Sequence, residues 1–247
     1  MVLSFPFCCR PPAGGRDDPG PVIVTCPALT RASNGTAQDR HHAARFRNSG
    51  RTIVFAVSRL PYLRRDDLDP DGQQVWDAVV GSRGDLLIDD QGGLAGPFNA
   101  FVHAPDVGQR LASLGKVLRF DTSLERRLTE VAILTVGARW KAEFEWWAHA
   151  RMARRHGVPD AVVDAIAAGQ DPPVQADDER TVYAVARELS QAGRVGQDAY
   201  TAAQRLLGDA GLVELVSLCG YYTLISFLLN AFEVPLPPGV PATWDGT

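Results

Sequence analysis

Two glutamates and a histidine in the middle of the chain have the types and spacing needed for acid–base chemistry. Glu145 and His149 are four residues apart, so on a helix they share one face. Glu130 lies in the preceding apolar stretch, where a carboxylate is either solvent-exposed or buried with a partner, and His149 is the obvious partner. A carboxylate beside an imidazole selects its tautomer and makes it a better base. The pattern therefore indicates a proton-transfer site.

Two other interpretations of these residues stay open. A Glu-x-x-x-His pair is common on exposed helices, where an ion pair of this spacing contributes only about 0.2–0.5 kcal/mol. Glutamate and histidine can also bind a metal ion. Di-iron bundles, however, repeat a Glu-x-x-His motif on two helices, and this chain has no such repeat. We therefore favour acid–base chemistry and predict no metal site.

Helices are the elements expected to hold these residues. Apolar residues recur at helical spacing from Ser58 onward, and period-two alternation is almost absent. A capping-box signature at 122–125 predicts the start of the helix that carries Glu130. Gly157 predicts the end of the helix that carries His149. The predicted helices cover about 71–82, 105–120, 122–139, 141–156, 159–169, 177–192, 197–207 and 211–232. The fold class is therefore all-α, with about eight helices.

Composition excludes several classes of protein. The 247 residues are 45% apolar, enough for a hydrophobic core. The 25 Lys and Arg residues against 29 Asp and Glu residues give a net charge of −4, so neither nucleic acid nor an anionic membrane is an expected partner. The longest apolar stretch, 212–232, is interrupted by polar residues, and we expect no membrane span. Four cysteines without a CxxC pair predict neither a disulfide scaffold nor a zinc site, and we expect a cytoplasmic protein.

Three parts of the chain differ in composition. Residues 1–57 contain six prolines, and only 21–25 and 52–57 resemble strands. We interpret this part as a flexible N-terminal extension, with a small ordered β element as the alternative. The helical domain is predicted to cover 58–238, and 239–247 form a tail.

Several motifs follow one another in a specific order between residues 96 and 169. They are Gly96-Pro97-Phe98-Asn99-Ala100, Leu118-Arg119, the run from Arg127 to Leu134, and Glu145-Trp146-Trp147-Ala148-His149 closed by Gly157-Val158. In this order they resemble the carboxymuconolactone decarboxylase family, whose relatives include the alkylhydroperoxidase D proteins. Residues 177–232 are similar to the second part of such chains, so the resemblance covers about 58–238. It implies an alkylhydroperoxidase D-like helical fold and a homo-oligomer, either a trimer or a hexamer, with sites near subunit boundaries.

The thiols of the family's peroxidase branch are missing from this chain. That branch has two cysteines on the histidine helix, and these positions fall on Ala142 and Glu145. Its glutamate and histidine match Glu130 and His149. Peroxidase chemistry of this type requires a thiolate and a resolving partner, so the sequence argues against it.

The resemblance then implies the lactone decarboxylase branch, which works without thiols or cofactors. His149 would shuttle a proton, Glu130 would orient it, and Glu145 would be a second acid or base. Residues expected to bind a small anionic substrate are Asn99, His103, Arg139 and Trp146, with Arg119 as a second candidate cation and Tyr221 or Tyr222 as possible phenol donors. The predicted activity is a cofactor-independent decarboxylase or isomerase-type lyase. The alternatives are a non-catalytic oligomeric ligand-binding protein and a non-thiol hydroperoxidase.

Overall fold

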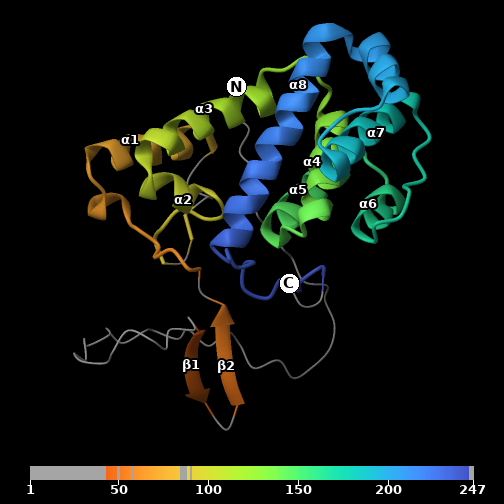
Figure 1. Cartoon of the computed structure of the whole chain (residues 1–247). Helices are drawn as coiled ribbons and strands as arrows, with labels where there is room; N and C mark the ends of the chain where they lie inside the picture. Colours follow the sequence, from red (N-terminus) through yellow and green to blue (C-terminus); the bar gives the residue numbers. More distant parts are fainter. Residues whose placement is uncertain (1–42, 49–50, 57, 84–87, 90, 245–247) are drawn as a thin grey trace. The chain divides into compact units, whose positions relative to one another are not determined.

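Eight helices make up the helical domain in the part of the chain that the structure, a computed structural model, describes (Figure 1). The described residues are 43–48, 51–56, 58–83, 88–89 and 91–244. The helices are α1 (Pro70–Arg83), α2 (Phe98–His103), α3 (Pro105–Phe120), α4 (Arg126–Trp140), α5 (Glu143–Arg155), α6 (Asp160–Ala167), α7 (Asp177–Ala192) and α8 (Gln197–Ala231), with a 3-10 turn at Arg65–Asp67. The predicted all-α, alkylhydroperoxidase D-like fold class is confirmed for the helical domain.

A short β-hairpin precedes the helices. Strands β1 (Ala43–Asn48) and β2 (Arg51–Ala56) pair antiparallel, with Ala43 opposite Ala56 and Asn48 opposite Arg51. The hairpin is an ordered β element of the kind left open above, although the sequence placed only its second strand. Residues 1–42, including the strand expected at 21–25, lie outside the described residues, so the flexible extension stays a prediction.

Helix α4 is the centre of the core. Its residues 128–137 are all buried, which is typical of a helix enclosed on every side. It packs against α5, α7 and α8, whereas α1, α2 and α3 pack against one another (Figure 1). In this second group, a Cβ atom at Gly108 would lie 2.2 Å from the carbonyl oxygen of Phe101. Glycine is therefore required for the close approach of α2 and α3. Because Glu130 lies within α4, its carboxylate is held inside the core.

Helix α8 joins two predicted helices into one bent element. Gly208, with φ 68° and ψ 179°, breaks the helical geometry near the expected boundary. This left-handed φ favours glycine. By length and composition, α8 is long and apolar enough to cross a membrane, with a mean hydropathy of 1.8 over its most apolar stretch. Half of that stretch is buried within the helical domain, however, as is common for a core helix.

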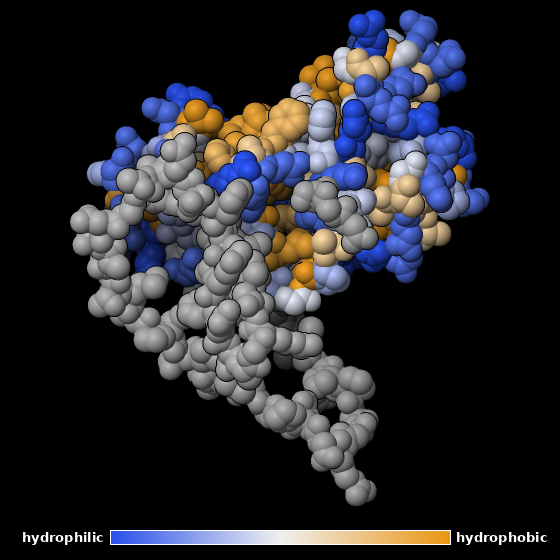
Figure 2. Space-filling model, turned by 60° about the horizontal axis from the view of Figure 1, so that its bottom comes forward, coloured by the Kyte–Doolittle hydropathy of each residue, from blue (hydrophilic) through white to orange (hydrophobic). Residues whose placement is uncertain are grey.

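Large apolar side chains remain exposed on α3 and α8. They are Val107, Leu114, Val117 and Phe120 on α3, and Tyr200, Leu206, Val213, Val216, Leu224 and Phe227 on α8. Figure 2 shows hydrophobic surface on the helical domain bordered by hydrophilic residues. Exposed apolar area of this kind suits contact with another protein surface. The homo-oligomer stays a prediction, as does the cytoplasmic location.

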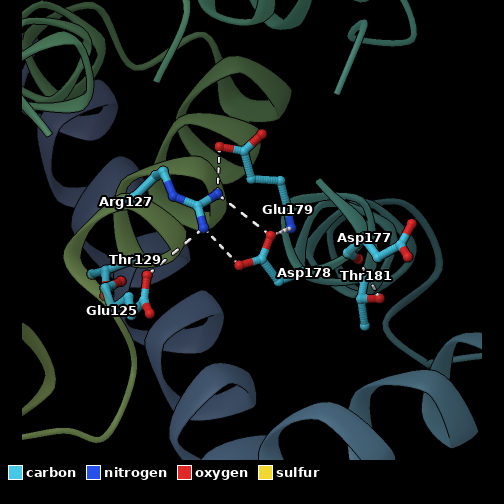
Figure 3. Close-up of polar contacts among 7 residues, drawn as sticks. All are labelled: Glu125, Arg127, Thr129, Asp177, Asp178, Glu179 and Thr181. Carbon is cyan, nitrogen blue, oxygen red and sulfur yellow. Dashed lines mark hydrogen bonds and ion pairs between the residues drawn. The ribbon is translucent and has the colours of Figure 1, made fainter. Parts of the chain in front are cut away.

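The start of α4 is tied to α7 by an ion-pair network (Figure 3). Arg127 lies 2.6 Å from a carboxylate oxygen of Asp178 and 2.6 Å from one of Glu179, with Glu125 at 3.7 Å. The side chain of Glu179 is only 6% exposed, so Arg127 neutralises a carboxylate that water cannot reach. Hydrogen bonds to Asp178 and Glu179 raise the pKa of Arg127, although partial burial opposes them. The network fixes the register of α4 against α7.

We expect Arg127→Ala to lower the free energy of unfolding by about 2–4 kcal/mol, because it leaves a buried carboxylate unpaired. Chemical denaturation followed by circular dichroism measures this change. Arg180→Ala is the matched control, because Arg180 pairs with Asp177, whose side chain is 94% exposed. An equal effect of the two substitutions would contradict a special role for the network.

Candidate functional site

His149 lies between two carboxylates in the core. Its Nδ1 atom is 2.7 Å from Oε2 of Glu130, which belongs to α4, and the two groups form a hydrogen bond. Its Nε2 atom is 2.9 Å from Oε1 of Glu145, one turn earlier on α5. This second contact lacks hydrogen-bond alignment, so Glu145 Oε1 is a buried oxygen without a hydrogen bond among the described residues. The structure thus brings together all three residues that the spacing singled out.

The charges that His149 and the glutamates exert on one another outweigh the effect of burial in this cluster. Glu130 is 1% exposed, Glu145 4% and His149 5%. Burial disfavours the imidazolium, but the charges of Glu130 and Glu145 and the hydrogen bond to Glu130 outweigh it and raise the pKa of His149 from 6.5 to about 9. At neutral pH the imidazole therefore carries a proton and is paired with both carboxylates.

Glu130 stays ionised for the corresponding reason. Burial alone would raise its pKa, but His149 and then Arg119 outweigh it and hold the pKa of Glu130 below 4.5. Arg119, near the end of α3, is partly exposed, and the same carboxylates favour its charge. The positive charges of His149 and Arg119 thus lie close enough to the two carboxylates to offset their negative charge.

Arg119 is an arginine whose positive charge interacts with the carboxylates of Glu130 and Glu145. Its side chain donates to the sulfur of Met152 at 3.1 Å, and its Nε has no hydrogen-bond partner among the described residues. A thioether is a weak acceptor, so the guanidinium retains donors for a stronger one. The alternative cation, Arg139, makes its contacts elsewhere: its Nε donates to the carbonyl of Ser190 at 3.3 Å.

One tyrosine of α8 contacts the imidazole, and a second tyrosine packs against the first. The ring of Tyr222 meets the His149 ring edge to face, with 5.1 Å between centroids, and the ring of Tyr221 packs against Tyr222 at 5.4 Å. Burial raises the pKa of Tyr222 well above 10, so its phenol is neutral. The Tyr221 hydroxyl donates to the carbonyl of Leu111. The absence of a side chain at Gly115 makes room for this hydroxyl, because a Cβ atom there would lie 2.2 Å from it.

The segment that carries this site matches a known family model. Residues 105–188, which contain Arg119 and the Glu130–Glu145–His149 cluster, match the Carboxymuconolactone decarboxylase family. The resemblance found in the sequence is thereby confirmed as a family-model match over this segment. No curated protein matches the chain significantly.

Solved structures similar to this chain share its fold at low identity. An alkylhydroperoxidase AhpD core protein from Ralstonia eutropha JMP134, described as an uncharacterized peroxidase-related protein, has a TM-score of 0.60 at 16% identity, covering 73% of this chain and 93% of that one. The debrominase Bmp8 in its apo form has a TM-score of 0.56 at 15% identity, covering 72% and 91%. A peroxidase-related protein from Silicibacter sp. TM1040 has a TM-score of 0.55 at 12% identity, covering 72% and 91%. At these identities the similarity establishes the fold alone.

The remaining residues expected at the substrate site contact other parts of the protein. Asn99 Nδ2 donates to the carbonyl of Pro61 at 3.1 Å, and His103 Nε2 lies 2.9 Å from the same oxygen. Both side chains therefore hold the segment before α1 against α2. Trp146 is buried and packs edge to face against Trp244, with 5.3 Å between ring centroids. No sequence signal indicated that a residue of the tail would pack there.

The described residues include few candidates for binding a metal ion or for thiol chemistry. Among the described residues, no group of three or more His, Cys, Asp or Glu side chains is arranged to hold a metal ion. Each ring nitrogen of His149 already faces a carboxylate oxygen, so neither is directed at a shared metal position. Cys219 is free and buried, and burial raises its pKa to about 12, which disfavours the thiolate.

Proposed function

We propose that this protein is a cofactor-independent acid–base enzyme of the carboxymuconolactone decarboxylase type. Its substrate would be a small carboxylated molecule, lactone-like or otherwise enolisable, and its reaction a decarboxylation or an isomerisation. The observation that carries the proposal is the buried contact of His149 with Glu130 at 2.7 Å and with Glu145 at 2.9 Å. A protonated imidazole between two carboxylates is a proton donor held ready in a site shielded from water.

His149 is the general acid in this proposal, because its raised pKa leaves it protonated at neutral pH. In a decarboxylation, the bond to the substrate carboxylate breaks, carbon dioxide leaves, and the electron pair moves into a conjugated carbonyl as a dienolate. The imidazolium then gives its proton to the substrate carbon and becomes neutral. A proton from water restores it, so the reaction needs no oxidant, reductant or metal ion.

The neighbouring groups support both proposed reactions. Glu130 keeps His149 charged and oriented through the Nδ1 hydrogen bond. Glu145 Oε1, a buried oxygen with no hydrogen bond in the described part of the chain, can accept a proton from an enolisable carbon in an isomerisation. Arg119 has unused donor capacity and is suited to bind the substrate carboxylate.

A non-catalytic ligand-binding protein is the second candidate, and the burial of the cluster favours it. The three acid–base side chains are at most 6% exposed, so they offer a substrate little contact area in a single chain. A non-thiol hydroperoxidase with a bound metal is less well supported, because no group of three or more His, Cys, Asp or Glu side chains in the described part of the chain could hold a metal ion.

The experiment that tests the proposal follows turnover of a substrate panel. The full chain is incubated with carboxylated lactones and β-keto acids while carbon dioxide release is measured. Deuterium uptake from solvent into enolisable lactones is followed in parallel by NMR. We expect release or exchange above the protein-free rate, unchanged by a metal chelator. Ligand binding with neither release nor exchange would support the binding protein and contradict the enzyme.

A further inference from the structure

A surface hollow lies apart from the acid–base cluster. It has a volume of about 340 Å³ and lies between the end of α4, the end of α6, α7 and the tail. None of Glu130, Glu145, His149 and Arg119 lines it. A volume of this size is within the range of sites that bind small molecules, about 300–1,000 Å³.

The side chains that line the hollow carry a net positive charge, whereas the whole protein carries a net negative charge. Arg139, Lys141 and Arg187 line it, and Asp171 is its one acidic lining residue. The whole chain has a net charge of −4, so three cations around one small hollow form a local positive field. Within the described part of the chain, Arg187 pairs with Asp171 at 2.8 Å, whereas Arg139 and Lys141 form no ion pair. The net charge of the lining therefore favours an anion.

Arg187 is the cation best prepared to bind that anion. The Asp171 side chain that it contacts is 81% exposed, and an exposed pair of this kind contributes less than about 1 kcal/mol. Its Nε atom is buried and lacks a hydrogen-bond partner among the described residues. The guanidinium lies 5.6 Å from the centre of the Tyr183 ring, which restricts its orientation. A planar carboxylate can accept two parallel hydrogen bonds from such a group.

The rest of the lining is apolar and aromatic. Tyr183 and Trp244 provide rings, and Ile166, Ala167 and Ala168 provide small or aliphatic surface. Trp244 is held in place on three sides, because its indole donates to the carbonyl of Ala167 at 2.9 Å, its amide to Glu143 at 2.8 Å, and its ring packs against Trp146. A rigid ring in a small hollow favours a flat ligand over a flexible one.

We infer that this hollow, formed by Arg139, Lys141, Arg187, Tyr183 and Trp244, is a binding site for a small aromatic carboxylate. The carboxylate lies against the three cations, and the ring lies against Tyr183 and Trp244. The inference does not depend on the proposed function, because the site shares no residue with the acid–base cluster.

Benzoate is the probe, titrated into the full chain and followed by calorimetry and tryptophan fluorescence. We expect benzoate to bind with a millimolar or lower Kd and to change the fluorescence of Trp244. Benzamide, which has the same ring without the charge, should bind at least about tenfold more weakly, a difference of about 1.4 kcal/mol. Arg187→Gln should weaken benzoate binding by a similar factor, and Arg187→Lys should have an intermediate effect.

The matched control is Arg110→Gln, because Arg110 is an exposed α3 residue that pairs with Asp106 and does not line the hollow. It should leave benzoate binding unchanged. Circular dichroism checks that every variant is folded, and Lys141→Gln replaces Arg187→Gln if the latter is not. Absence of benzoate binding, or equal binding of benzoate and benzamide, would overturn the inference. So would binding that survives Arg187→Gln but is lost in Arg119→Gln, because the anion would then occupy the acid–base cluster.

Discussion

Replacing His149 with glutamine is expected to reduce turnover of any substrate found in the panel by about 10²–10⁴-fold, the usual contribution of a positioned general acid. Glutamine can still contact Glu130 and Glu145, but it cannot transfer a proton at neutral pH. The loss should appear mainly in kcat, because His149 acts on the reacting carbon whereas Arg119 is assigned the substrate carboxylate. Steady-state kinetics of carbon dioxide release or deuterium exchange measures the effect.

His156→Gln is the matched control for this substitution. His156 is an exposed histidine at the end of the same helix, and its replacement should leave kcat unchanged. If His149→Gln alone fails to fold because it leaves two carboxylates unpaired, the double variant with Glu130→Gln removes one of them. A folded His149→Gln protein with wild-type turnover would show that the acid–base cluster is structural only.

Replacing Glu130 with glutamine is expected to move the alkaline limit of activity to lower pH. In the wild-type protein the reaction needs protonated His149, so the rate should be level near neutral pH and fall as the pH rises through about 9. Glu130→Gln removes the charge that contributes most to this raised pKa, so the fall should begin at lower pH. A pH–rate profile of each protein measures the shift.

The free energy of unfolding should also change with pH as His149 titrates. The pKa of His149 is about 9 in the folded protein and 6.5 without its partners. Its stabilising effect is therefore complete below about pH 6.5 and is lost as the pH rises through about 9. The wild-type protein should lose stability over this window, and Glu130→Gln should lose less of it over the same window. At neutral pH the substitution itself should cost about 3–5 kcal/mol, because it breaks a buried pair. Identical pH dependence of the two proteins would contradict the pairing of Glu130 with His149.

Periodicity predicted the helices well because helical spacing of apolar residues reflects burial in one core. The same reasoning placed Glu130, Glu145 and His149 together, because two of them are one helical turn apart and the third lies in a helix that is buried all round. Local sequence signals were wrong at the start of α4. The capping box at 122–125 is wrong: α4 begins only at Arg126, and its N-cap residue is Glu125, with no capping hydrogen bond from a side chain.

Choosing the cation at the site also required three-dimensional information. Arg119 and Arg139 each lie near the end of a helix, where a basic residue is common, so the sequence could not distinguish them. In the folded chain, α3 brings Arg119 to the carboxylates, whereas Arg139 lines the hollow beside α7. The hollow itself depends on Trp244, which packs against Trp146 although 97 residues separate them in the chain. No local pattern encodes a contact of that kind.

The most direct test of the account is the protonation state of His149. Nitrogen-15 NMR of the full-length protein, labelled at its five histidines, follows each imidazole through a pH titration, and His149→Gln assigns the signal. We expect His149 to be a doubly protonated imidazolium at neutral pH and to titrate with a midpoint near 9. A midpoint at or below 6.5, with a neutral imidazole at pH 7, would contradict it.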